Sequence, residues 1–118
     1  MAGQALVLCE HRPDPQGGWE LTARFLHADP ATLLDQLERA GVAGRAHPDD
    51  LSLQSRSELL FQDDDARHAT TLSVTDVHDV QAHAPPDGWG HLHAWAAFMY
   101  ALDPAGEHTR LIVWFTDH

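Results

Sequence analysis

Two histidines and one aspartate form the most specific candidate for chemistry in this sequence. His91 and His93 make an H-x-H pair, and Asp117 precedes the last residue. If residues 91–102 pair with residues 109–116 as an antiparallel hairpin, His93 faces Asp117, and His91 lies two positions back on the same face. Two imidazoles and a carboxylate are typical ligands of zinc or iron. The alternative interpretation is a solvated sheet end with one weak hydrogen bond.

Two further groupings suggest chemistry less specifically. In the segment TDVHDV, Asp76 and His78 share one face of a predicted strand and Asp79 follows, so that a carboxylate could orient an imidazole as a general base. The motif G-x-S-x-G is absent, and polar residues on an exposed strand are the alternative. Cys9 and His11 also share a face, which could lower the pKa of the thiol, although a buried and inert cysteine is the alternative.

Two loop segments are candidates for binding a partner. Asp63, Asp64 and Asp65 are consecutive, but the calcium loop pattern D-x-D-x-D-G is missing. They are therefore interpreted as a solvated turn or as a contact surface for a basic protein. Trp89 lies in the loop sequence PPDGWG, where aromatic residues are enriched at binding surfaces. It could equally fold back over an open end of the sheet.

Alternating segments, short apolar runs and a stretch rich in Thr and Val predict that most of the chain is antiparallel sheet. The predicted strands are residues 4–12, 19–27, 51–62, 69–83, 91–102 and 109–116. Residues 91–102 also fit a helix, but the sequence from Asp103 to Gly106 is typical of a hairpin turn and favours strands. The expected fold is one α+β domain over residues 1–118, with the order ββ-α-ββββ and one helix packed on one face of about six strands.

The single predicted helix covers residues 30–40. Asp29 suits the N-cap, Pro30 suits the first helical position, and Gly41 suits a left-handed C-terminal stop. Val42 is then expected to contact Leu37, as in a Schellman ending. In the strand 19–27, the alternation places four apolar residues on one face. These are Trp19, Leu21, Ala23 and Phe25.

Composition restricts the class of protein. The chain has 18 acidic residues against 7 arginines and no lysine, and its net charge is −11. Such a field repels phosphate backbones, which argues against nucleic-acid binding, and it either attracts a basic partner or simply maintains solubility. No segment reaches the roughly 18 apolar residues of a membrane helix. The start of the chain has no basic signal-peptide region, so a cytoplasmic protein without membrane association is expected.

These observations favour a non-enzymatic binding module, which associates with a protein partner or with itself. Inhibitor and immunity proteins share this composition, although no motif identifies a family. Self-association is expected at the predicted strand 69–83, if that polar strand forms a sheet edge. The alternative is a small metal protein or enzyme that uses His91, His93 and Asp117. No cofactor is expected on the first interpretation, and zinc or iron is expected on the second.

Overall fold

The computed structural model describes residues 4–27, 30–46, 48–62, 67–82, 90–105 and 107–116. Four strands and four helices lie in these segments. In chain order they are β1 (Gln4–His11), β2 (Glu20–His27), α1 (Pro30–Arg39), α2 (Leu53–Gln62), β3 (Arg67–Leu72), α3 (Val74–Ala82), α4 (Gly90–Leu102) and β4 (Thr109–Thr116).

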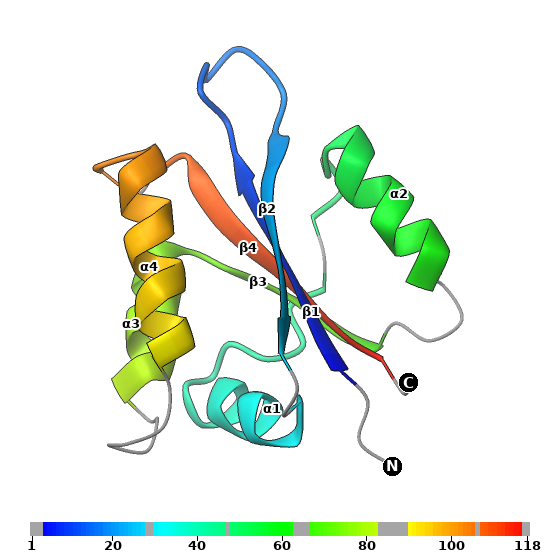
Figure 1. Ribbon diagram of the computed structural model, residues 1–118, viewed down its shortest axis with the longest axis vertical. Helices are drawn as coiled ribbons and strands as arrows, with labels where there is room; N and C mark the ends of the chain where they lie inside the picture. Colours follow the sequence, from blue (N-terminus) through cyan, green and yellow to red (C-terminus); the bar gives the residue numbers. More distant parts are fainter. Residues whose placement is uncertain are drawn as a thin grey trace.

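The strands form one antiparallel sheet in the order β2-β1-β4-β3. Helices α1, α3 and α4 cover one face, and α2 lies on the other side (Figure 1). Residues 111–115 of β4 are all buried, as expected for a strand that is covered on both faces. The predicted α+β class with an antiparallel sheet is therefore confirmed, whereas the predicted six strands and single helix are wrong.

The first hairpin and the last strand agree with the sequence analysis. Strands β1 and β2 pair antiparallel and β4 begins at Thr109, as predicted. The predicted single apolar face of β2 is wrong, because a β-bulge interrupts the pairing. Cys9 faces Ala23 but Glu10 faces Leu21, so Thr22 is the extra residue. An extra residue moves the following side chains to the opposite face. Ala23 therefore packs on the face that α1, α3 and α4 cover, and Leu21 packs on the opposite face.

Helix α1 forms as predicted and ends in a Schellman motif. Gly41 has a φ of 74°, which is the left-handed conformation that glycine adopts without steric cost. The Val42 N–H donates to the Leu37 carbonyl at 3.0 Å, and the Gly41 N–H donates to the Glu38 carbonyl at 3.1 Å. Val42 and Leu37 are both buried in the core. Asp29, the predicted N-cap, lies outside the described residues.

The predicted strand 51–62 is instead helix α2. Ser52 caps it: the Ser52 Oγ accepts a hydrogen bond from the Ser55 N–H at 3.1 Å. This bond satisfies one of the N–H groups that a helix start leaves free. Leu53 is 78% exposed, whereas an apolar residue of a half-buried strand would face the core. The alternation of leucines in this segment is therefore not a strand pattern.

The predicted strand 69–83 divides at Ser73 into β3 and helix α3. Ser73 and Asp76 form a reciprocal capping box: the Ser73 N–H donates to Asp76 Oδ2 at 2.8 Å, and the Asp76 N–H donates to Ser73 Oγ at 3.1 Å. The outer side of β3 is occupied by residues 42–46. There the Ala46 N–H donates to the Ala69 carbonyl at 2.9 Å. The long polar edge strand expected to pair with a second copy is therefore absent.

The predicted strand 91–102 is helix α4. The Asp103 N–H donates to the Met99 carbonyl at 3.0 Å and completes the last helical turn. The segment after it does turn, because Asp103 accepts hydrogen bonds from the backbone N–H groups of Ala105 and His108. This turn joins a helix to β4 and not two strands. The predicted hairpin between residues 91–102 and 109–116 is wrong.

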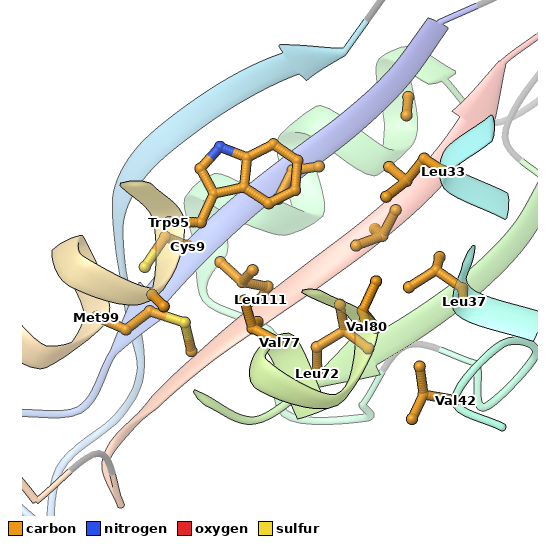
Figure 2. Packing of buried hydrophobic residues seen from close by; sticks show 14 of the residues in the cluster. Cys9, Leu33, Leu37, Val42, Leu72, Val77, Val80, Trp95, Met99 and Leu111 are labelled. Atoms are coloured by element: carbon orange, nitrogen blue, oxygen red, sulfur yellow. The ribbon is translucent and has the colours of Figure 1, made fainter. Parts of the chain in front are cut away.

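The main core lies between the sheet and helices α1, α3 and α4. Figure 2 shows Trp95 and Met99 of α4, Val77 and Val80 of α3, and Leu33 and Leu37 of α1 against Leu72, Leu111 and Cys9 of the sheet. A smaller cluster fills the opposite face, around Leu6, Leu8, Leu51, Ile112 and Trp114. The sheet is thus apolar on both faces, and polar side chains buried in it need partners.

Candidate functional site

The hairpin that would assemble the predicted metal site does not form. His91 and His93 belong to α4, and Asp117 lies outside the described residues. The strand pairing that placed His93 opposite Asp117 is therefore lost. Within the described segments, no group of three or more His, Cys, Asp or Glu side chains is arranged to hold a metal ion. The metal site stays a prediction from the sequence.

The two predicted partner-binding segments lie outside the described residues. They contain Asp63, Asp64, Asp65 and Trp89. Their roles therefore stay predictions. In the part of the chain that is described, no helix is long and apolar enough to cross a membrane.

The grouping in TDVHDV has separate structural roles. Asp76 caps α3 and accepts a hydrogen bond from Arg45 Nη1 at 2.7 Å. His78 Nε2 lies 3.2 Å from the Tyr100 hydroxyl of α4. Asp79 is exposed. Because Asp76 is hydrogen-bonded to Ser73 and Arg45, it does not orient the imidazole of His78. The predicted pair of Asp76 and His78 as a general base therefore does not form.

Replacing Asp76 with asparagine is expected to lower the free energy of unfolding at neutral pH by about 1 kcal/mol. Burial raises the pKa of Asp76, but hydrogen bonds from Ser73 and Arg45 outweigh it, so the pKa lies below its ordinary 3.8. A lowered pKa gives stability above that ordinary value, which is lost as the pH falls through the folded-state pKa. Urea unfolding at neutral pH and at a pH below 3.8 should therefore show a smaller difference at the lower pH. An equal difference at both pH values would contradict this origin.

Cys9 is buried in the core. Burial raises the pKa of its thiol to about 11. A hydrogen bond with Thr22 lowers this pKa, and the neighbouring Glu10 charge raises it. Because the thiolate is the reactive form, iodoacetamide is expected to leave Cys9 unmodified in the folded protein and to alkylate it fully in denaturant. Mass spectrometry would follow the reaction. Rapid alkylation without denaturant would contradict the buried position.

The most unusual polar arrangement lies at one end of the smaller cluster, where Glu10 of β1 faces Arg110 of β4. Glu10 is fully buried, and Arg110 is 8% exposed. Arg110 Nε donates to Glu10 Oε1 at 2.8 Å. Glu10 Oε2 accepts the Ser52 N–H at 2.9 Å, at the N-terminus of α2. A carboxylate is favoured there because the first N–H groups of a helix carry partial positive charge.

Asp50 and Trp19 complete the surroundings of Arg110. Asp50 Oδ1 accepts from Arg110 Nη1 at 2.9 Å. Burial raises the pKa of Asp50, but the hydrogen bond and the charge of Arg110 outweigh it, so the pKa lies below its ordinary value. The Arg110 guanidinium lies 3.9 Å from the centre of the Trp19 ring, which is cation–π distance. Arg110 of β4 thus contacts β1 through Glu10, the segment before α2 through Asp50, and the connection before β2 through Trp19.

Arg12 lies against the same indole but has no acidic partner among the described residues. Its guanidinium carbon is 5.1 Å from the centre of the Trp19 ring. Its Nε is buried without a hydrogen bond, and no hydrogen bond of Nη1 or Nη2 is present in the described structure. We call these residues the Arg110 cluster, which consists of Glu10, Arg12, Trp19, Asp50, Ser52 and Arg110.

Sequence reasoning missed this cluster. Glu10 and Arg110 are 100 positions apart in the chain. Pairing them requires β1 to lie beside β4, whereas the sequence analysis paired β4 with residues 91–102. The available signal was a charged residue next to an apolar run in each strand, since such residues need a partner when they are buried.

Comparisons with protein-family models, with curated proteins and with solved structures find no match to this chain. Its function is therefore argued from the molecule itself.

Proposed function

We propose that this chain is a binding module for a positively charged protein partner. The observation that supports it is the distribution of ion pairs. Arg24, Arg39, Arg45 and Arg110 each pair with an acid of the same chain. Exposed acids without an ion pair in the described structure are Asp14, Glu20, Glu38, Asp49, Asp79 and Glu107. These four cations are neutralised internally, so carboxylates dominate the free charge of the described surface.

A surface of this kind accelerates encounter with a basic protein and excludes acidic ones. The exposed acids of the described residues lie in α1, α3, β2 and three connecting segments, so their negative charge is distributed over several elements. The densest acidic run in the sequence, Asp63 to Asp65, is the proposed contact site, with Trp89 as a candidate aromatic anchor.

Two triple variants of equal charge test the proposal. The first is Asp63→Asn, Asp64→Asn, Asp65→Asn, and the matched control is Asp14→Asn, Asp79→Asn, Glu107→Gln. Each raises the net charge by three from −11. Affinity capture with wild-type protein, followed by titration of the captured partner, should show the first variant losing affinity and the control keeping most of it. Equal losses would indicate a general field without a contact site, and no loss in either would contradict a charge-based function.

Self-association through a sheet edge is the second candidate, and the edge that favours it is β2. Within the described segments β2 pairs with β1 alone, whereas β3 is covered by residues 42–46. The bulge at Thr22 opposes it, because bulges twist an edge away from regular pairing. Light scattering over a range of concentrations would decide. A mass that stays at 13.1 kDa would exclude this candidate.

A further inference from the structure

We propose that Arg12 and Trp19 form a binding site for a carboxylate group. The site is separate from the acidic surface proposed above, because here the chain offers a cation. The first observation is that Arg12 differs from every other arginine whose side chain is described. The others bond to acceptors of the same chain: Arg24 to Glu58, Arg39 to Asp35, Arg45 to Asp76, Arg56 to the Asp49 carbonyl, and Arg110 to Glu10 and Asp50.

An unpaired arginine is unexpected in a chain with 18 acidic residues and 7 arginines. The two acids of the Arg110 cluster do not compensate it, because Glu10 and Asp50 are both bonded to Arg110. The buried Nε of Arg12 also lacks an acceptor, which costs free energy. Unsatisfied polar groups of this kind call for an explanation, and an absent ligand is one.

The position of Arg12 is fixed before any ligand arrives. Trp19 lies against the Arg110 guanidinium at 3.9 Å, and Arg110 is held by two carboxylates. Arg12 in turn lies 5.1 Å from the same indole. A guanidinium that already rests on a ring loses little freedom when it binds, so more of the interaction energy appears as affinity.

The atoms that remain available define the ligand. Among the described residues Nη1 and Nη2 of Arg12 have no hydrogen-bond partner, and neither is one of the buried atoms that lack one, so they reach solvent. Two parallel N–H groups match the two oxygens of a carboxylate. A carboxylate carries a single negative charge, and the net −11 of the chain repels it less than a doubly charged phosphate. Distant acids are screened beyond about 10 Å at 0.1 M salt, whereas a direct contact is not.

The carboxylate can belong to a peptide C-terminus or to an acidic side chain, and three probes separate these sources. N-acetylglycine presents a C-terminal carboxylate, N-acetylglutamic acid α-amide presents a side-chain carboxylate, and N-acetylglycinamide is a neutral control. Each is titrated into ¹⁵N-labelled protein while the Arg12 Nε–H and Trp19 Nε1–H resonances are followed. We expect saturable shifts with at least one carboxylate and none with the amide. The tighter carboxylate identifies the source.

Variants then assign the shifts to the site. Arg12→Ala should weaken binding about tenfold or more, because a charge-assisted pair of hydrogen bonds is lost. Arg12→Lys keeps the charge without the two parallel donors, so its affinity should lie between those of wild type and Arg12→Ala. It also tests the site if the alanine variant does not fold. Arg24→Ala removes an exposed arginine elsewhere and should leave the shifts unchanged. The proposal is overturned if no carboxylate gives a saturable shift, or if Arg12→Ala and Arg12→Lys both bind as well as wild type.

Discussion

Replacing Arg110 with methionine is expected to lower the free energy of unfolding by about 3–5 kcal/mol, the largest loss we expect from a single polar residue. The reason is Glu10, which is fully buried and would keep a carboxylate without its cation. Breaking a buried ion pair on one side costs more than the pair itself contributes, because the remaining charge stays out of water. Urea unfolding at neutral pH measures the loss.

A second substitution tests whether the loss comes from Glu10. Glu10→Gln removes the charge but retains an amide oxygen that can accept the Ser52 N–H. In wild type it should destabilise, because Arg110 loses its buried partner. In the Arg110→Met background it should recover part of the stability, since no uncompensated charge is left. Additive effects of the two substitutions would refute the coupling. Asp50→Asn is the matched control, and it should cost little, because the Asp50 side chain is 63% exposed.

The same pair shows where sequence reasoning reaches its limit. Glu10 and Arg110 meet only because β4, the last strand in the chain, lies beside β1, the first. Each strand was predicted correctly from its own apolar run. Their adjacency depends on what the segment before β4 does, and that segment was assigned the wrong conformation. The wrong prediction of a strand at residues 91–102 therefore had two consequences. It hid the contact between Glu10 and Arg110, and it produced the predicted metal site.

Of the three misassigned helices, α3 had the clearest signal in the sequence. In α3, Val74, Val77 and Val80 are all buried and three residues apart. This spacing fits one side of a helix, whereas in a strand Val77 would point away from Val74. The serine–aspartate capping box at Ser73 marks the same start. The Thr and Val content of the segment favours a strand and opposes both signals.

Helix α4 had a weaker signal, because few of its residues are polar. Its 13 residues contain no Asp, Glu or Arg. Such a segment fits a helix as well as a strand, and the two then differ only in the contacts that the rest of the fold offers. Helix α1 is the opposite case. Its Schellman stop at Gly41 and its leucine stripe are local features, so its sequence alone was sufficient.

Replacing Trp95 with alanine is expected to destabilise the protein by about 3–5 kcal/mol, because Trp95 fixes α4 onto the sheet. The side chain is 3% exposed, and its ring stacks on Phe25 of β2 at a centroid distance of 5.7 Å. Phe98 meets the same Phe25 ring edge-on at 6.0 Å. Removing the indole leaves a cavity between helix and sheet that both rings line, and the lost contacts are not replaced. Thermal and urea unfolding measure the effect.

Two controls on α4 separate this packing from general damage to the helix. Tyr100→Ala removes an aromatic that is 39% exposed and should cost less than about 1 kcal/mol. Ala97→Gln decides the conformation itself. Ala97 is exposed on the helix, so glutamine should change stability by no more than about 0.5 kcal/mol. In the hairpin predicted from the sequence, the same residue faces Val113 inside the sheet, and an unpaired amide there would cost about 1–3 kcal/mol. A large loss for Ala97→Gln would therefore contradict α4, whereas a small loss beside a large one for Trp95→Ala supports it.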